Sequence, residues 1–261
     1  MPVLWLVLLL TFPGSTWAQP SAPSNALQEG EDLIYNVRYG PFNLGSVHIR
    51  TLQRKISSPY VEYYCRANID SYPKVPFVDL HATFDSEIDS AVYSHHFVGK
   101  LKQDDFWSFA RYTFDYKHKM ALIEKGDRDT NITKRDTMTI DGVIQDGLSL
   151  FFYARDQLFS KKQTVIPTLI NEQRVLTRID FSGKRDAVEI DAVDYPIDAV
   201  GFDGIADFVG IFGMSGDFEG WFSNDDARVP IMAKMKVLVG NVTIELMQWK
   251  RSGWVPPRAK E

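Results

Sequence analysis

The fold of this 261-residue chain depends on one stretch, Asp141-Gly-Val-Ile-Gln-Asp146-Gly-Leu-Ser-Leu-Phe151-Phe152-Tyr-Ala-Arg155-Asp-Gln-Leu158. It has the pattern of a helix, because its apolar residues fall near helical spacing: Val143, Leu148, Phe151, Phe152 and Leu158. Asp146 is placed to cap the first turn. We therefore predict a helix over 141–158 whose aromatic and aliphatic stripe is buried against something else.

Most of the remaining chain alternates apolar and polar residues with a period of two, the pattern of strands with one buried face. We expect strands near 33–39, 44–54, 60–70, 78–85, 91–101, 106–116, 118–124, 132–139, 162–169, 174–182, 185–193, 228–239 and 242–249. Gly240 and Asn241 would form a two-residue hairpin loop. These patterns predict an all-β fold, an antiparallel meander curled into a barrel or half-barrel around the one main helix.

The tract 194–216 interrupts the alternation with five glycines spaced among apolar residues. A glycine-rich segment of this length is a poor helix. Two interpretations stay open at this point. The tract is either a mobile flap over the sheet or a buried irregular connection.

The first 18 residues have the pattern of a secretory signal peptide that is cut after Ala18, although no Lys or Arg precedes the apolar run. We expect residues 19–29 to form a flexible leader, 30–252 a single β-rich domain and 253–261 a tail, of which 256–261 would be frayed. No other stretch approaches the roughly 20 apolar residues of a membrane-spanning helix. The mature chain is thus expected to be exported, periplasmic or envelope-associated, and without a transmembrane segment.

Charge and cysteine content narrow the function classes. A net charge of −5 provides no basic face, so nucleic-acid binding is not expected. The single cysteine, Cys65, shares a predicted strand face with Tyr63 and Ala67, which indicates a small core residue without a disulfide partner.

No motif predicts a catalytic residue, a metal site or a cofactor. His95 and His96 are neighbours on a predicted strand, so they point to opposite faces and are poorly placed to share a metal ion. Ser149 and Ser223 lie in no nucleophile elbow. Whether the chain is an enzyme stays open, with a non-catalytic role favoured.

Three motifs together resemble a known family: Gly30-Glu31-x-Leu33-x-Tyr35-x-Val37-x-Tyr39-Gly40, then Asp146-x-Leu148-Ser149-x-Phe151-x-Tyr153-x-Arg155, then Gly220-Trp221-Phe222-Ser223-x-Asp225-x-x-Arg228-x-Pro230. In this order they are similar to the bacterial domain-of-unknown-function family number 3108. The resemblance implies an exported bacterial protein with a curled antiparallel sheet, little helix and no established activity. The glycine-rich insertion at 200–216 departs from that pattern.

Several motif residues are expected to be structural. Asp146 would cap the helix, and Arg155 would bind carbonyls or an acidic group such as Asp225. Trp221 and Pro230 flank the turn that would fix this contact.

Two functions from different classes follow from the surplus of aromatic residues, which make up 13% of the chain. The first is an envelope protein that binds a lipid or another apolar small molecule between sheet and helix, through Trp107, Tyr112, Phe151 and Phe212. The alternative is a non-enzymatic scaffold or assembly component with a filled interior, which contacts another envelope protein through its surface, including unpaired strand edges.

Overall fold

The computed structural model describes residues 25–57, 60–73, 75, 79–128, 130–207, 216–237 and 240–260. The predicted signal peptide, 1–18, lies outside the described residues. A first series of strands consists of β1 (Asp32–Tyr39), β2 (Phe42–Ser57), β3 (Tyr60–Ser71), β4 (His81–Asp89), β5 (Ser94–Lys102), β6 (Trp107–Asp115), β7 (Met120–Asp127) and β8 (Asn131–Thr139). Helix α1 (Ser149–Gln157) follows. The second series consists of β9 (Gln163–Ile170), β10 (Gln173–Val188), β11 (Ile197–Ala206), β12 (Gly216–Ser223), β13 (Pro230–Lys236) and β14 (Asn241–Lys250).

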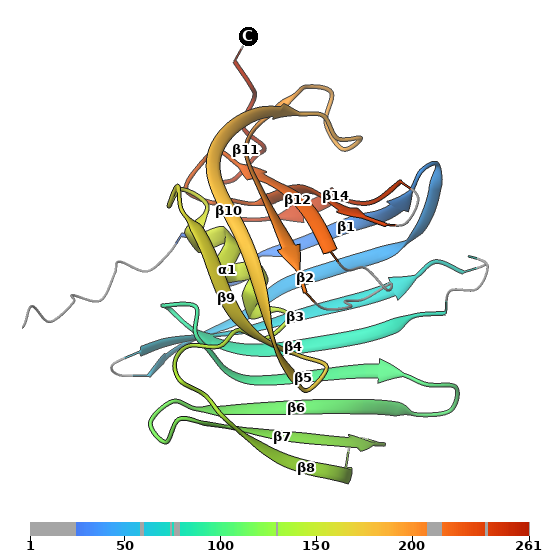
Figure 1. Ribbon diagram of the computed structural model, residues 1–261. Helices are drawn as coiled ribbons and strands as arrows, with labels where there is room; N and C mark the ends of the chain where they lie inside the picture. The colour runs from blue at the N-terminus through green and yellow to red at the C-terminus, as the bar shows by residue number, and fades with distance from the viewer. Residues whose placement is uncertain are drawn as a thin grey trace, which may run out of the picture.

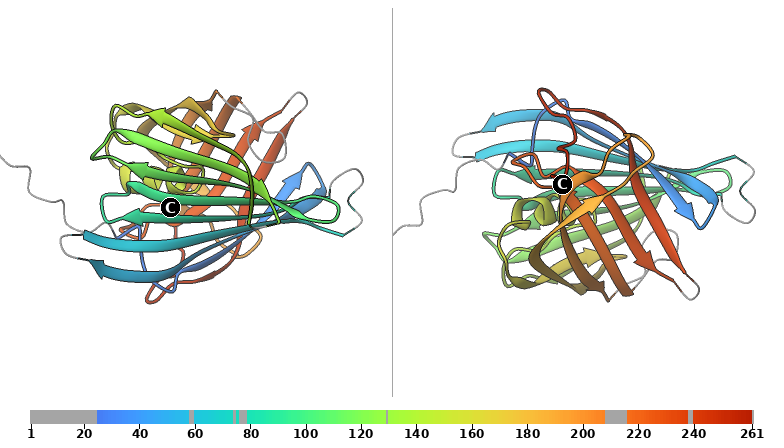
Figure 2. Two further views of the ribbon diagram at one scale, coloured as in Figure 1. Left: turned by 90° about the horizontal axis from the view of Figure 1, so that it is seen from below. Right: turned by 90° about the horizontal axis from the view of Figure 1, so that it is seen from above.

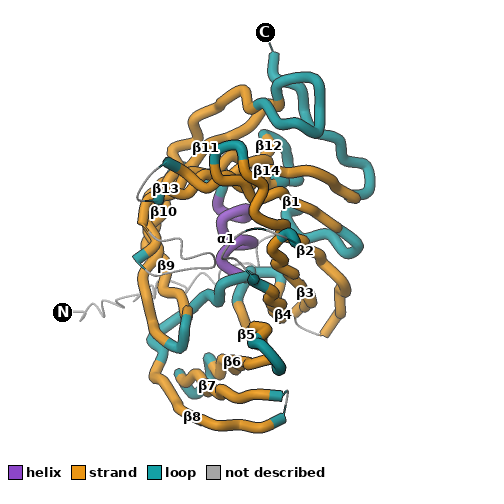
Figure 3. The backbone as a smooth tube through the Cα atoms, turned by 90° about the vertical axis from the view of Figure 1, so that its right-hand side faces the viewer, coloured by secondary structure: helices purple, strands orange, loops and turns teal. Residues whose placement is uncertain are grey.

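All of these strands belong to one antiparallel sheet, in the order β8-β7-β6-β5-β4-β3-β2-β1-β14-β13-β12-β11-β10-β9. Two meanders thus meet where β1 pairs with β14, and β8 and β9 are the two margins (Figure 1). The strands of the second meander cross those of the first at an angle (Figure 2). The sheet is curled, and α1 lies on its concave side (Figure 3). The prediction of an all-β fold, a curled antiparallel meander with one helix, is confirmed.

Alternation of side chains determines which face of the sheet is inside. On β1, buried Leu33, Tyr35 and Val37 alternate with partly exposed neighbours, as predicted. Bulges bend the long strands. β10 is one 16-residue strand with a register shift between Asp180 and Lys184, where Gly183 has a φ of +69°. The two strands expected at 174–182 and 185–193 are therefore one, because a bulge bends a strand without ending it.

The helix is shorter than predicted, 149–157 instead of 141–158. Residue 145 explains the difference. Gln145 makes a parallel bridge with Thr168, and its backbone N–H donates to the Pro167 carbonyl at 2.9 Å. The backbone groups of Gln145 therefore form their hydrogen bonds with the margin strand β9 and not with a preceding turn of helix. The predicted two-residue loop Gly240-Asn241 is also different, because Asn241 pairs with Lys236 and is the first residue of β14.

The glycine-rich tract is largely sheet. β11 pairs with β12, and each glycine in the middle of this pair faces an aromatic residue: Gly201 faces Trp221, Gly204 faces Phe218, and Gly220 faces Phe202. A Cβ added at Gly220 would lie 2.4 Å from the Phe202 ring. Glycine is thus required so that the rings can lie against the backbone. The flap interpretation is wrong for 197–206, and residues 208–215 lie outside the described part of the chain.

Both ends of the domain are better anchored than expected. In the predicted leader, Ala26 and Leu27 are buried. In the predicted tail, the Trp254 indole donates to Asp225 at 2.8 Å, and the Ala259 N–H donates to the Pro196 carbonyl at 2.9 Å. The fraying expected for 256–261 is wrong for 256–260, the part that the structure describes, because composition alone does not reveal such distant partners.

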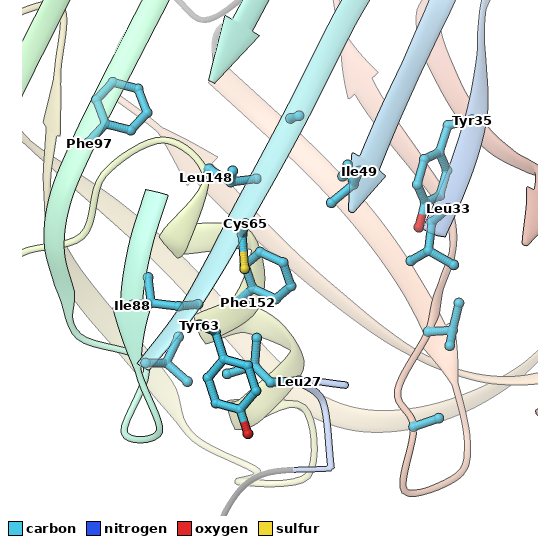
Figure 4. Close-up of a cluster of buried hydrophobic side chains, with 14 of the residues drawn as sticks. Leu27, Leu33, Tyr35, Ile49, Tyr63, Cys65, Ile88, Phe97, Leu148 and Phe152 are labelled. Atoms are coloured by element: carbon cyan, nitrogen blue, oxygen red, sulfur yellow. The ribbon is translucent and has the colours of Figure 1, made fainter. Parts of the chain in front are cut away.

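The main group of core side chains packs on α1 and comes from both meanders, from Leu33 of β1 to Leu246 of β14. Phe152 has no exposed surface, and its ring lies beside Cys65 of β3 and near Ile88 of β4 (Figure 4). A second group of buried side chains, around Phe181, Phe202 and Phe222, packs on the other side of the helix against Ala154 and Leu158. The helix therefore joins the two halves of the sheet through apolar contacts.

Candidate functional site

The sequence predicts a ligand in the concave interior. Two buried polar clusters, here called joints, connect the helix with the surrounding sheet in this region. The first is Asp146, which has no exposed surface. One carboxylate oxygen accepts the N–H groups of Leu148 and Ser149, at the start of the helix, at 2.7 and 2.8 Å. The other oxygen accepts the hydroxyls of Ser86 and Ser94 at 2.6 and 2.5 Å, which ties the helix to β4 and β5.

Burial raises the pKa of the Asp146 carboxyl, while the hydrogen bonds from the two serines and the two amides oppose that rise. Both carboxylate oxygens are fully engaged by donors. The group is therefore a joint between helix and sheet rather than a free acid.

The second joint is an ion cluster of Arg155, Glu31 and Arg251. Arg155 and Glu31 are 0% and 2% exposed. The Arg155 guanidinium donates to both carboxylate oxygens of Glu31, at 2.5 and 3.0 Å, and Arg251 also binds this carboxylate. Although burial acts to lower the pKa of Arg155, the charge of Glu31 raises it overall. The cluster thus carries one carboxylate between two buried cations.

Arg155 also connects the helix with the closing motif. Its Nε and Nη2 donate to the carbonyls of Arg228 and Ala227, at 3.1 and 3.0 Å. Arg155 thus bonds both to carbonyls and to an acidic group, and this acidic group is Glu31 instead of Asp225. The Asp225 carboxylate is occupied by the turn itself, where it accepts the N–H groups of Ala227 and Arg228 and the indole of Trp254.

The four residues predicted to bind a ligand do not form one wall. Trp107 lies five residues before Tyr112 on the regular strand β6, so the two side chains point to opposite faces. Tyr112 is 2% exposed and stacks on Phe97 with the ring centroids 5.2 Å apart. Phe151 packs edge-on against Phe152 at 5.3 Å. Phe212 lies outside the described residues.

Two hollows in the described surface lie away from the space between sheet and helix. The larger has about 490 Å³ and is lined by the β1–β2 turn, from Arg38 to Phe42, and by Gly240, Asn241 and Thr243. The smaller has about 140 Å³ and lies between residues 140–144 and the β9–β10 hairpin. Side chains of the protein itself, among them Tyr112, Phe152 and Arg155, occupy the concave interior.

The potential nucleophiles in this region have structural partners. Burial raises the pKa of the Cys65 thiol. The Ser149 hydroxyl accepts the Asp146 N–H at 2.8 Å, and the Ser223 hydroxyl donates to Asp225 at 2.8 Å. Among the residues that the structure describes, no three His, Cys, Asp or Glu side chains come together as a metal site.

The remaining motif residues shape the second meander. The Trp221 indole donates to Asp186 at 3.1 Å, and Pro230 opens β13 opposite Phe222. Sequence reasoning missed Glu31, Arg251, Ser86 and Ser94. A signal for Ser86 existed, because it lies in step with the buried Ala82 and Ile88 of β4. Glu31 belongs to the first of the three family motifs, whereas no local pattern distinguishes Arg251.

Solved structures resemble the fold at low sequence identity. A beta-barrel-like protein of the domain of unknown function DUF1849 from Brucella abortus matches with a TM-score of 0.53 and 12% identity, over 86% of this chain and 98% of that chain. A protein with a YmcC-like fold from Bacteroides fragilis matches with a TM-score of 0.39 and 8% identity, over 88% of this chain and 100% of that one. The first likeness supports the curled barrel-like fold alone.

The comparison with family models agrees with the three motifs. No curated protein matches the chain. No helix in the described ranges is long and apolar enough to cross a membrane. The model of DUF3108, a protein family of unknown function, matches residues 34–247, which covers most of β1, the helix and most of β14. The chain therefore belongs to the DUF3108 family, as its motifs predicted.

Proposed function

We propose that this protein is an exported, non-catalytic component of the bacterial envelope that acts by binding another protein through its surface. One observation supports this proposal most strongly. The concave interior is occupied by the chain's own side chains and by the two polar joints, whereas exposed aromatic surface lies at the β1–β2 turn. Of the two functions that the sequence leaves open, the scaffold or assembly component fits this distribution better.

The hollow beside the β1–β2 turn has the composition of a protein contact. Phe42 is 67% exposed and Tyr39 is 36% exposed, with Pro41 between them in the wall of the hollow. Arg38 contributes a guanidinium that is held by Glu245 and Asp191. Exposed aromatic residues next to arginine are typical of the residues that contribute most to protein interfaces. An apolar side chain of a partner would insert beside Phe42.

Photo-cross-linking in the native cell tests this function. We expect a photoreactive phenylalanine analogue at position 42 to yield an adduct of discrete mass with one protein. Position 56 is the matched control, because Ile56 is 74% exposed but lies near the opposite end of β2. Adducts with lipid alone at position 42, or the same adducts at both positions, would contradict the proposal.

Binding of a lipid or another apolar molecule between sheet and helix, which the sequence also suggests, stays a prediction. It requires Tyr112 and Phe151 to leave their present ring contacts and open a space. Stoichiometric lipid bound to the purified protein would favour this function over the protein contact.

A further inference from the structure

The two margins of the sheet are protected differently. β9 is blocked, because Gln145 bonds to Pro167 and Leu169 along its outer edge, and Pro167 has no N–H to donate. β8 pairs with β7 on one side only. Eight of its nine residues are exposed, and Met138 is the partly buried exception. β8 therefore presents an open edge in the described structure, as its position in Figure 1 shows.

The backbone groups of β8 alternate between β7 and this open edge. The Ile140 N–H donates to Lys119 on the side of β7. The Thr137 N–H, an odd number of residues away, bonds instead to the side chain of its own neighbour Asp136 at 2.8 Å. Because neighbouring residues of a strand point their amides in opposite directions, Arg135 and Thr137 direct their backbone groups to the open edge.

The sequence along this edge is complementary to itself. If a second β8 runs antiparallel with Arg135 opposite Arg135, then Lys134 faces Asp136 of the other copy, and Thr133 faces Thr137. Lys134 and Asp136 lie on the concave face, 64% and 60% exposed, with their charged atoms 3.7 Å apart within one chain. The pairing forms the opposite-charge contact twice, which is the arrangement that a two-fold interface requires.

The two Arg135 side chains at the centre of this pairing do not repel each other as unpaired charges. The Arg135 guanidinium is bound by Glu124 of β7, at 2.9 and 2.7 Å, on the other face of the sheet. Each copy thus brings its own carboxylate to the two-fold axis. We propose that β8 is a self-association edge, through which a second copy of this chain continues the sheet by antiparallel β8–β8 pairing.

This inference does not depend on the partner proposed at the β1–β2 turn, and it concerns the purified protein alone. One margin strand buries little surface, so we expect a weak dimer that forms in roughly the micromolar range and dissociates on dilution. Charges on a margin strand can instead keep sheets apart. That role predicts a monomer at every concentration.

Charge exchange distinguishes the two roles. Lys134→Asp places Asp opposite Asp, and Asp136→Lys places Lys opposite Lys, so each single variant should lose self-association by analytical ultracentrifugation. A mixture of the two variants should form a heterodimer, and the double exchange Lys134→Asp with Asp136→Lys should restore the homodimer. All these positions are exposed, so folding should be preserved. A monomeric wild type, or a mixture that stays monomeric, would overturn the proposal.

Cross-linking tests the register separately. Arg135→Cys should form an intermolecular disulfide on oxidation, because opposite residues of a hydrogen-bonded antiparallel pair have Cα atoms about 5.5 Å apart. Thr139→Cys, four residues from the two-fold axis, is the control and should not cross-link. The natural Cys65 is buried and does not compete. Equal cross-linking at 135 and 139 would contradict this register.

Discussion

Removing the Glu31 carboxylate should be among the most destabilising single changes in this protein. Glu31→Gln keeps the shape of the side chain but leaves Arg155 and Arg251 without their shared counter-charge, and the side chains of these arginines are 0% and 5% exposed. Breaking a buried ion pair from one side costs about 3–5 kcal/mol. In a domain of this size each kcal/mol lowers Tm by about 2–4 °C, so we expect a decrease of about 6–20 °C.

Urea unfolding followed by tryptophan fluorescence measures this free energy. Asp207→Asn is the matched control, because Arg178 Nη2 also contacts both Asp207 oxygens, at 3.2 and 2.9 Å, but on the surface. The two side chains are 47% and 45% exposed, and such pairs contribute about 0–1 kcal/mol. If Glu31→Gln costs no more than Asp207→Asn, the cluster does not hold together the helix, the start of β1 and the end of β14.

Three further changes test the interior. Burial raises the pKa of Asp146 in the folded state. As the pH rises from the pKa of the unfolded carboxyl to the raised folded pKa, the wild type should therefore lose stability relative to Asp146→Asn, by about 1.4 kcal/mol for each pH unit between the two values. Urea titrations at several pH values measure this loss, and a stability difference that does not depend on pH would refute it. Phe152→Ala should cost about 3–5 kcal/mol in the same assay, whereas Phe159→Ala, at a side chain 40% exposed, should cost far less. Gly220→Val should prevent the close contact with Phe202 and lower Tm, and an unchanged Tm would show that the second meander adapts.

Local sequence patterns correctly predicted those features of the fold that depend on residues close together in the chain, such as which side chains of a strand face inward. The alternation on β1 placed Leu33, Tyr35 and Val37 inside, as the structure has them. The same parity rule separates Trp107 from Tyr112, so the sequence already contained the reason that they cannot share a wall.

Features that depend on distant residues could not be predicted in this way. Glu31 and Arg155 are 124 residues apart, and no composition or spacing joins them. The glycines of 197–206 suggested a flexible segment. Glycine is needed there because aromatic rings of the partner strand lie against the backbone, and this partner cannot be seen in the local sequence. Gln145 was assigned to a helix by its neighbours, although β9 provides its hydrogen bonds.

An interior filled by the protein's own side chains is the central claim, and native mass spectrometry of the protein, purified without detergent from the cells that produce it naturally, tests it most directly. We expect the mass of the polypeptide without bound lipid, and no saturable binding of a fluorescent fatty acid added afterwards. A stoichiometric lipid adduct, displaced by that fatty acid at micromolar concentration with quenching of tryptophan fluorescence, would contradict the claim and restore the ligand-binding function.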